Sequence, residues 1–592
     1  MVEGAMRLTD EQSLAVNEDG NLLLTACPGS GKTRTLIAKA VREIERLRGS
    51  PRRVCCITYT NSAAQEIEQR ASLEMQEGDE LHLSVSTIHA FCLQEVLRPY
   101  GWLLPDYRGA SRVLTRDNPD FETIANYAAQ RVTDDPLRTQ DYDAFESLNL
   151  NAAGELIGPA VENPTVAGAA SFFWQRCVEL GYLDFSLIIY RSYLILRDHP
   201  RVARTLCSKF AWFLVDEFQD TTELQIEILR RLHDVGNSRF FLVGDLSQSI
   251  YAFTGARPEL VAPFGQYIQA RADLSLSQNF RSSAHIVQHG ERLFPRQPAM
   301  TAVGGNRTFA LEPVLVRGMT AFQAITEHFL PMLEEQGIEL GNATILGREW
   351  RGLIELARQL RDFGTPVVGP GARPYRRSRL FVTLAEQLCG AVVETQPGTM
   401  RQLERAVFNT ILDITGQPRL DIFTYEGRIL IMRMLHAAIR HAQHGGALAW
   451  LDRMSREVGR LLFETGYIDQ AQSALFLASV HEMNADMVRQ GIDAENLQIE
   501  DLGLFASPTR ALRLSTIHYA KGREYGAVAM IGLKRGSFPH FRADTPEAIA
   551  GDRRLFYVGV TRAERVLMYI AERDRWNNPP SIFLGADGVG ML

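Results

Sequence analysis

Residues 22–41, LLLTACPGSGKTRTLIAKAV, place a glycine-containing turn between an aliphatic run and a segment with apolar residues at helical spacing. The aliphatic run predicts a short buried strand, and Lys32 begins a predicted helix that continues through Leu47. Gly29 and Gly31 allow the backbone of the turn to curl with its N–H groups pointing inward, at the positive end of that helix. The stretch therefore predicts a phosphate site in an α/β fold.

The turn matches the phosphate-binding pattern GxxxxGK[ST] except at its first position, where Ala26 replaces glycine. Lys32 would reach the β- and γ-phosphates of a nucleotide, and the hydroxyl of Thr33 would ligate magnesium. A glycine-rich strand-to-helix turn without a ligand is the alternative, and the flanking strand and helix favour the phosphate site. Kinases, transport ATPases and motors share such a loop, so the rest of the chain must decide between them.

A second predicted strand, in FAWFLVDEFQDT at residues 210–221, ends in paired carboxylates. Strand ends at the C-terminal edge of a parallel sheet face the nucleotide in α/β folds. Asp216 would hold magnesium through its water shell, and Glu217 would orient and deprotonate the attacking water. The alternative is an acidic strand exit that faces solvent. The carboxylate pair is favoured because hydrolysis needs it on the same sheet as the phosphate loop.

Three further residues fit the handling of a γ-phosphate. Gln248 follows the apolar strand in FFLVGDLSQSIYAFTGA, residues 240–256, and could hydrogen-bond that group. Arg281 in LSQNFRSS and Arg562 in RRLFYVGVTRAERVL could neutralise the charge that develops on the transferred phosphoryl group. A single arginine is more often a surface salt-bridge partner. The assignment of these two arginines to the γ-phosphate therefore depends on the residues that flank them.

Composition sets the broad class of the protein. A chain of 592 residues is too long for one hydrophobic core, and its 45% hydrophobic content predicts several globular domains. The net charge of −7 argues against a surface that grips a polyanion everywhere, but it permits a local basic track. No run approaches 18 apolar residues and the N-terminus lacks a leader pattern, so we expect no membrane partner and a cytoplasmic location. The seven cysteines form no CxxC pair, so we expect neither zinc nor an iron–sulfur cluster.

In this order, the motifs resemble those of superfamily 1 DNA helicases of the UvrD/Rep (PcrA-like) group. The resembling stretches are LTDEQSLAV, ACPGSGKTR, ITYTNSAAQEIEQR, VSTIHAFC, YLDFSLII, VDEFQDT, VGDLSQSIYAFTGA, QNFRSS, ATILGREWR, LRLSTIHYAKGREYGAV and DRRLFYVGVTRA. Together they span nearly the whole chain, and ordered motifs in this number are highly specific.

The resemblance implies ATP and Mg²⁺ as cofactors and assigns roles around them. Gln12 would read the adenine edge, Arg34 and Phe280 would sandwich its ring, and Glu524 would touch the ribose. The implied catalytic residues are Lys32, Glu217, Gln248, Arg281 and Arg562. Thr33 and Asp216 would hold the metal, and Arg70 would contact the γ-phosphate together with Arg281 and Arg562. The nucleotide would also contact the phosphate loop at Pro28, Gly29, Ser30 and Gly31.

The resemblance also implies a track for single-stranded DNA. Its residues would be Tyr59, Thr60, Thr87, His89, Tyr251, Phe253, Arg348, Thr516 and His518. Such a track is physically sensible, because aromatic rings stack on bases of any sequence while threonines and arginines bind phosphates. The alternative for Tyr251 and Phe253 is core packing after a strand, and for the two histidines a structural role.

The resemblance implies two RecA-like P-loop NTPase cores, each a parallel sheet flanked by helices, with two mainly helical accessory domains inserted in them. We expect core 1A over 1–90 and 206–280, domain 1B over 91–205, core 2A over 281–372 and 512–592, and domain 2B over 373–511. We expect domain 2B to be compact, and its sequence lacks the glycine-rich hairpin with which relatives grip duplex DNA. At its entrance RPYRRSR, residues 373–379, is either a local contact to a nucleic-acid backbone or a solvated charge run.

These features predict an ATP-driven translocase on single-stranded DNA and a 3′–5′ DNA helicase that engages junctions between single and double strands. The alternative is a helicase-like ATPase subunit of an antiphage-defence or repair complex, which binds DNA or nucleotide and regulates a partner nuclease or repair protein. A P-loop kinase or transport ATPase is disfavoured, because arginines of the fourth and sixth motifs are expected on a second core, as an ATP motor requires.

Overall fold

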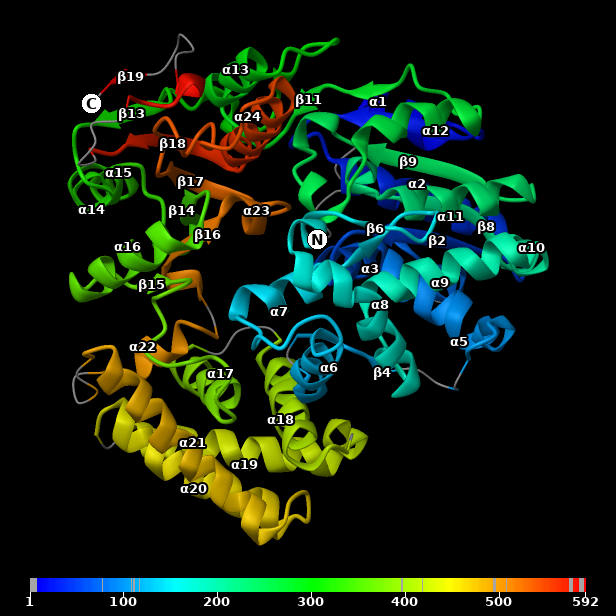
Figure 1. Cartoon of the computed structure of the whole chain (residues 1–592). Coiled ribbons are helices and arrows are strands. Elements are labelled where there is room, and N and C mark those ends of the chain that lie inside the picture. The colour runs from blue at the N-terminus through cyan, green and yellow to red at the C-terminus, as the bar shows by residue number, and fades with distance from the viewer. Residues whose placement is uncertain are drawn as a thin grey trace. The chain divides into compact units, whose positions relative to one another are not determined.

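The structure is a computed structural model. It describes residues 8–592 except 77, 108, 110–111, 117, 395–397, 418, 444, 493, 495–496, 507, 574–578, 585–589 and 592. Contact density divides the chain into two compact units, the first comprising Met1–Ala310 with Thr545–Thr561 and the second Leu311–Asp544 with Arg562–Leu592. Each unit is built on one large β-sheet (Figure 1).

The sheet of the first unit has six strands, all parallel. In spatial order they are β10 (Ser275–Leu276), β1 (Leu22–Ala26), β9 (Arg239–Gly244), β8 (Phe210–Val215), β2 (Arg53–Thr58) and β3 (Leu83–Thr87). The strand before the phosphate loop and the strand before the paired carboxylates are therefore separated by one strand only. This confirms that both lie on the same sheet.

Alternating residues of the strands feed two hydrophobic cores, one on each face of this sheet. Along β8, Trp212 and Leu214 join the core that contains helices α2 (Lys32–Leu47) and α3 (Asn61–Glu74). Phe213 and Val215 belong to the opposite core, together with α11 (Glu223–Asp234). A sheet covered by helices on both faces needs strands that are apolar throughout, and every residue of β8 is buried.

Further helices complete the first unit. They are α1 (Asp10–Asn17), α4 (Ile88–Phe91), α5 (Arg98–Tyr100), α6 (Pro119–Ala129), α7 (Thr139–Glu146), α8 (Pro164–Glu179), α9 (Phe185–Asp198), α10 (Pro200–Lys209), α12 (Val261–Tyr267), α13 (Ala284–Leu293) and α24 (Pro546–Val560). Short strand pairs are β4 (Arg112–Val113) with β7 (Tyr182–Leu183), β5 (Asn149–Leu150) with β6 (Leu156–Ile157), and β11 (Gln278–Asn279) with β12 (Thr301–Ala302). The described residues between 91 and 205 are thus mostly helical, as expected.

The second unit contains a sheet of seven strands, again parallel. In spatial order they are β15 (Val367–Val368), β16 (Leu512–Thr516), β14 (Ala343–Gly347), β17 (Tyr525–Met530), β18 (Ala563–Ala571), β13 (Val314–Arg317) and β19 (Gly590–Met591). Helices α14 (Ala321–Ala324), α15 (Leu330–Glu335), α16 (Trp350–Asp362) and α23 (Ile517–Ala520) accompany it. Two parallel sheets with flanking helices confirm the expected α/β class.

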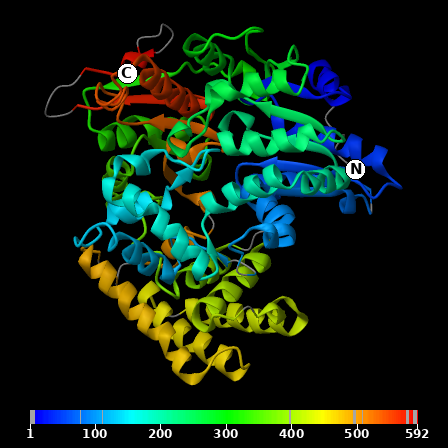
Figure 2. The same ribbon diagram turned by 45° about the vertical axis from the view of Figure 1, so that its right-hand side comes forward.

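The insertion between β15 and β16 is helical and has its own hydrophobic core (yellow and orange in Figure 2). Its helices are α17 (Val382–Val393), α18 (Thr399–Thr415), α19 (Tyr425–Ala442), α20 (Ala447–Glu464), α21 (Gln470–Arg489) and α22 (Ile499–Gly503). Among the described residues of 373–511 no strand is present, in agreement with the mainly helical insertion that the sequence predicts.

The two compact units differ from the expected core boundary after residue 280. Residues 281–310 and 545–561 group with the first sheet, because side chains there bond to loops of that sheet. Arg296, for example, reaches the carboxylate of Asp245 after β9 at 2.6 Å. The division into four domains otherwise remains a prediction.

The arginine-rich segment 373–379 is held by carboxylates of its own unit. Arg373 donates from Nε and Nη2 to Glu386 at 2.7 and 2.9 Å. Arg379 donates to both oxygens of Asp486, on α21, at 2.9 and 3.0 Å. The segment therefore anchors the start of the helical insertion. Neither sequence interpretation included this role, because Asp486 lies 107 positions from Arg379.

This anchor makes a pH-dependent contribution to stability. The Arg379 side chain holds the pKa of the Asp486 carboxyl well below its usual range. Such a carboxyl stabilises the folded state only while ionised, so its contribution is present above about pH 4 and is lost as the pH falls further. We expect Asp486→Asn to destabilise this unit by about 1.5–3 kcal/mol at pH 7, and the deficit to shrink at pH 3. Thermal unfolding followed by circular dichroism at both pH values measures it.

A matched control is Asp452→Asn, because Asp452 pairs with Arg456 on the exposed face of α20. Exposed pairs of this kind contribute about 0–1 kcal/mol, so this variant should unfold close to wild type at both pH values. A deficit of Asp486→Asn that is as large at pH 3 as at pH 7 would contradict the assignment.

The cysteines are core residues. All seven, Cys27, Cys55, Cys56, Cys92, Cys177, Cys207 and Cys389, are buried and free. Within the described part of the chain, no helix combines the length and the apolar character needed to cross a bilayer.

Candidate nucleotide and nucleic-acid site

The predicted site residues of the first unit gather at one edge of its sheet. Five neighbouring strands, β1, β9, β8, β2 and β3, end there at Ala26, Gly244, Val215, Thr58 and Thr87. The loops that follow them carry, in the same spatial order, the phosphate loop, Gln248, the carboxylate pair, Tyr59 and His89. Neighbouring strands are about 4.8 Å apart, so the nucleotide and DNA residues share one edge of the sheet. The proposed DNA residues follow β2 and β3, and Tyr251 and Phe253 add to them from the loop after β9.

The phosphate loop has the backbone that its glycines permit. Gly29 and Gly31 have φ values of 67° and 77°, in the left-handed region that favours glycine. The first hydrogen bond of α2 runs from the Thr35 amide to the Gly31 carbonyl at 2.9 Å. The amide groups of the preceding helical residues therefore have no acceptor within the helix and can serve an anion.

Two buried side chains brace this loop from other elements. The Gln12 amide on α1 donates to the Ser30 carbonyl at 2.9 Å, and the Asn279 amide on β11 donates to the Pro28 carbonyl at 2.8 Å. A Cβ atom at Gly31 would lie 2.9 Å from the Gln12 amide nitrogen, so the glycine also admits the brace. Gln12 thus supports the loop in addition to its predicted adenine contact, which stays a prediction.

Asn279 is a site residue that the sequence interpretation did not single out. Its side-chain oxygen accepts hydrogen bonds from the amides of Arg281 and Ser282 at 2.9 and 2.8 Å. Arg281 in turn donates to the Thr561 carbonyl at 2.9 Å. One asparagine therefore fixes the phosphate loop and the start of the arginine segment together, which is a reason for its burial.

The paired carboxylates follow β8 as expected. Asp216 is buried, and burial, with the charge of Glu217 as the next cause, raises the pKa of its carboxyl to about 7. The nearby Lys32 ammonium acts in the opposite direction. Glu217 has a φ of 51°, which is unusual for a residue with a side chain and costs about 1–3 kcal/mol of strain. Asp216 is thus a buried acid near Lys32, and its neighbour Glu217 has a strained backbone. These properties are typical of residues that bind a cation and a reacting water.

A hydrogen-bonded network links the carboxylates to Gln248. The Gln219 amide donates to Glu217, and its oxygen accepts from the Asp245 amide at 2.9 Å. Asp245 is fully buried and accepts from the Gln248 side chain at 2.8 Å. Arg296 neutralises Asp245 at 2.6 Å and also donates to Tyr557 at 3.1 Å. The network connects the loops after β8 and β9.

Three of the residues in this network, Gln219, Asp245 and Arg296, were not predicted as site residues. Gln219 and Asp245 stand within the quoted motifs, and their burial after apolar strands is the signal that could have found them. Arg296 has no such local signal, because its partner lies 51 positions earlier in the chain.

The proposed stacking residues of the first unit form one aromatic cluster. The rings of Tyr59 and Tyr251 stack with centroids 4.8 Å apart and an interplanar angle of 19°. Phe253 lies 6.1 Å from Tyr251, and half of its surface is exposed. The structure thus brings together residues from the loops after β2 and β9. Core packing does not describe Phe253, because a core side chain would be buried.

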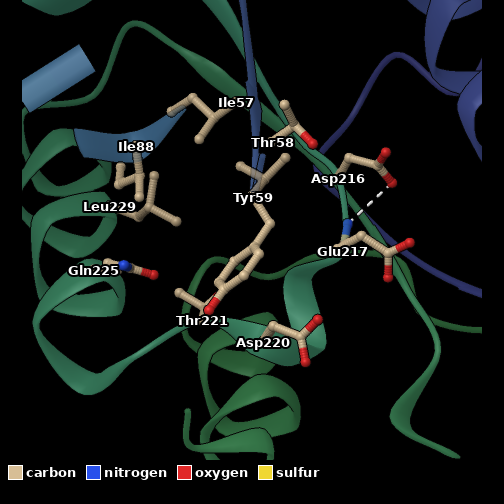
Figure 3. A pocket seen from close by; sticks show the side chains of 11 residues that line it. Ile57, Thr58, Tyr59, Ile88, Asp216, Glu217, Asp220, Thr221, Gln225 and Leu229 are labelled. Atoms are coloured by element: carbon tan, nitrogen blue, oxygen red, sulfur yellow. Dashed lines mark hydrogen bonds between the residues drawn. The ribbon is translucent and has the colours of Figure 1, made fainter. Parts of the chain in front are cut away.

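A cavity of about 30 Å³ is lined by Tyr59 and by both carboxylates (Figure 3). In Figure 3 the Tyr59 ring extends toward Thr221, with Leu229 and Gln225 on one side of it and Asp216 and Glu217 on the other. The strands that end at Thr58 and Val215 are hydrogen-bonded neighbours. A movement at the carboxylates therefore has a short path to this aromatic ring.

His89 follows β3 and has an aromatic neighbour that the sequence interpretation missed. Its ring meets Phe185 edge-on, with centroids 5.2 Å apart. Burial lowers the pKa of His89 to about 4, so the imidazole is neutral at pH 7. Phe185 is 49% exposed at the start of α9. The pair offers ring surface rather than charge.

The three predicted threonines share one structural role. Thr60, Thr87 and Thr516 each cap the helix that follows them, accepting from the amides of Ala63, Ala90 and Tyr519. Thr87 and Thr516 are also the last residues of β3 and β16, whereas Thr60 lies two residues beyond the end of β2. A capping hydroxyl still has its proton to donate. The caps therefore fix these hydroxyls at helix starts, and the predicted phosphate contacts stay predictions.

The remaining predicted residues of the first unit lie near the loop or on α3. Phe280 is 41% exposed, and its amide donates to the Gly29 carbonyl at 2.9 Å. Arg34 lies in the first turn of α2. Arg70 is exposed on α3 and pairs with Glu66 at 2.8 Å. Their contacts with a nucleotide stay predictions.

The other predicted residues belong to the second unit and lie at the two ends of the strands of its sheet. Arg348 and His518 follow the C-terminal ends of β14 and β16, and Arg348 donates to the Ser537 carbonyl at 3.2 Å. Glu524 and Arg562 directly precede β17 and β18. Arg562 is buried and donates to the Arg523 carbonyl at 3.2 Å.

The first sheet, its glycine loop and the adjacent carboxylates define a P-loop nucleotide-binding protein. A model of the UvrD/REP helicase N-terminal domain matches residues 8–269, and a model of the UvrD-like helicase C-terminal domain matches residues 487–574. The chain belongs to the UvrD/Rep helicase family.

Relatives with similar sequences extend over almost the whole chain. The ATP-dependent DNA helicase Rep of Escherichia coli K12 is 25% identical, over 96% of this chain and 91% of Rep. UvrD1 of Mycobacterium leprae is 25% identical over 98% of this chain and 85% of its own length. PcrA of Leuconostoc citreum is 25% identical over 95% of this chain and 81% of its own length.

Proposed function

We propose that this protein is an ATP-dependent DNA helicase that moves along single-stranded DNA in the 3′ to 5′ direction. The observation that carries the proposal is the shared edge of the first sheet, where the nucleotide residues follow β1, β9 and β8 and aromatic residues follow β9, β2 and β3. Family membership and relatives named ATP-dependent DNA helicases support it.

In the proposed reaction, Lys32 neutralises the β- and γ-phosphates, and Glu217 orients a water molecule and accepts its proton. The residues that would hold Mg²⁺ are Thr33 and Asp216, and the buried carboxyl of Asp216 fits a cation, which removes the cost of burying its charge. Bound magnesium would neutralise charge on the phosphates. Arg281, Arg562 and Arg70 are the proposed guanidinium partners of the γ-phosphate.

Gln248 is the proposed connection between hydrolysis and the DNA track. It lies within the network of Gln219 and Asp245, and Tyr251 follows it by three residues. Loss of the γ-phosphate would change what Gln248 contacts, and the short segment between them would carry the change to the aromatic cluster. Such a path is a physical hypothesis about coupling between two sites.

Base stacking on Tyr59, Tyr251 and Phe253 would give sequence-independent binding, worth about 1–3 kcal/mol per base. We add Phe185 to this proposed track, because it is exposed beside His89. Thr60, Thr87, Thr516, His518 and Arg348 would contribute contacts along the strand.

The alternative, a subunit that regulates a partner nuclease, is not favoured, because the named relatives are helicases. A nuclease or repair protein as an additional partner remains a prediction. Free, buried cysteines agree with a reducing compartment and support the predicted cytoplasmic location.

Strand displacement tests the proposal. Duplexes with a 3′ single-stranded tail, a 5′ tail or blunt ends are incubated with the purified protein, ATP and Mg²⁺. We expect displacement from the 3′-tailed duplex only, together with ATP hydrolysis that rises when single-stranded DNA is added. Preference for the 5′-tailed duplex would overturn the polarity. Failure of single-stranded DNA both to bind and to stimulate hydrolysis would overturn the function itself.

A further inference from the structure

Two exposed aromatic side chains of the second unit meet at the C-terminal edge of its sheet. Strands β14 and β16 are parallel neighbours, with Gly347 in register with Thr516. Trp350 and Tyr519 each stand three residues beyond those positions. Their rings lie edge to face, with centroids 6.0 Å apart and an interplanar angle of 65°. Neither residue was predicted to have a role.

The exposure of this pair calls for an explanation. Trp350 is 41% exposed and Tyr519 64% exposed, although both stand at helix starts that follow fully or largely buried strands. Large aromatic residues at the surface mark interaction sites more often than isolated aliphatic ones do. The pair therefore presents ring surface to a ligand at the edge where Arg348 and His518 also emerge.

The surrounding charges suit a polyanion. The guanidinium of Arg523 lies 5.9 Å from the centroid of the Tyr519 ring. The two segments that carry the pair, 348–351 and 518–524, contain four cationic residues, Arg348, Arg351, Lys521 and Arg523, against two acidic ones, Glu349 and Glu524. Rings flanked by cations are the arrangement that holds unpaired bases and their phosphates.

The first unit has a comparable arrangement. The sequence Ser-Thr-Ile-His occurs at 86–89 and again at 515–518. In both places the threonine ends a strand and caps a helix of four residues. Beside the first copy Phe185 lies edge-on to His89, and beside the second Trp350 lies edge-on to Tyr519. Each unit thus places an exposed aromatic ring next to the same turn.

We infer that Trp350 and Tyr519 form a stacking platform for an unpaired base of single-stranded DNA on the second unit. The inference rests on the proposed function and deepens it by naming residues that hold the strand. One ring face of the pair receives the base, and Arg523, whose guanidinium lies 5.9 Å from the centroid of the Tyr519 ring, meets an adjoining phosphate. Stacking carries no hydrogen-bond pattern, so the platform is sequence-independent.

Binding of a fluorescent oligothymidylate to the full chain, measured by anisotropy over a range of salt concentrations, tests this platform. We expect Trp350→Ala and Tyr519→Ala each to weaken binding about five- to 150-fold. The slope of log affinity against log salt should stay that of wild type, since no phosphate contact is lost. Trp350→Phe and Tyr519→Phe should retain most of the affinity, because they keep a ring.

Trp102→Ala is the matched control, because Trp102 is also exposed, at 64%, but lies in the first unit, in the short helix Gly101–Leu103. It should bind as wild type does. A single abasic position moved along the oligonucleotide gives a second readout. At one placement the missing base should weaken binding to wild type but should not change binding to Trp350→Ala. Thermal unfolding verifies that each variant is folded.

The outcomes separate this inference from the proposed function. If wild type binds single-stranded DNA and both alanine variants bind equally tightly, the platform is overturned and the helicase proposal stands. The platform is also overturned if the alanine variants lose affinity only through a changed salt slope. If wild type itself does not bind, the proposed function fails first.

Discussion

Lys32→Ala is expected to abolish DNA-stimulated ATP hydrolysis while single-stranded DNA binding stays near the wild-type level. The lysine is the first residue of α2, at the end of the phosphate loop, and no other lysine of the chain lies in that loop. Losing one positioned charge at a reacting phosphate costs about 10²–10³ in rate, and weaker nucleotide binding adds to this. Phosphate release measured with and without oligothymidylate gives the rate, and anisotropy gives the DNA affinity.

Lys209→Ala is the matched lysine control, because Lys209 pairs with Glu95 away from the loop at 2.6 Å. It should hydrolyse ATP as wild type does. Turnover of Lys32→Ala equal to wild type would refute the nucleotide site. Loss of DNA binding in a folded Lys32→Ala protein would show that the nucleotide site and the DNA track do not act independently.

Glu217→Gln is expected to slow hydrolysis about 10²–10⁴-fold, because the amide cannot take a proton from the attacking water. The change keeps the shape of the side chain, and the amide oxygen can still accept the hydrogen bond from Gln219. Nucleotide binding should therefore persist. Single-turnover hydrolysis and titration with a fluorescent ATP analogue separate the two effects.

Glu45→Gln supplies the comparison, since Glu45 is an exposed glutamate on α2 and is remote from the carboxylate pair in sequence. It should hydrolyse ATP normally. If Glu217→Gln retains wild-type single-turnover rates, another group is the base. If it loses nucleotide binding as well, Glu217 has a structural role in place of the chemical one.

The features with local signatures could be predicted from the sequence. The phosphate loop is one, because an apolar run, two glycines and Lys32 stand within a dozen residues. The carboxylate pair is another, because it ends an apolar strand. Such patterns are set by backbone conformation and burial within one segment. The two parallel sheets and the mainly helical insertions were expected from the resemblance of the ordered motifs to a helicase family.

Features that depend on contacts between distant segments could not be predicted. Asn279 braces a loop 251 positions earlier, and Asp486 pairs with an arginine 107 positions away. Neither residue differs locally from an ordinary polar side chain. The same holds for Trp350 and Tyr519, whose meeting depends on the register of two strands. Side-chain hydrogen bonds and ring contacts between distant segments form only in the folded chain, and they produce no periodic pattern in the sequence.

The double support of the phosphate loop by Gln12 and Asn279 has a thermodynamic consequence. A loop already fixed in its receptive shape loses little conformational entropy when a nucleotide arrives. More of the intrinsic binding energy then remains to drive rearrangement elsewhere in the molecule. Because the loop is already ordered, the free energy of nucleotide binding is not spent on ordering it. That free energy can instead drive a conformational change of the enzyme.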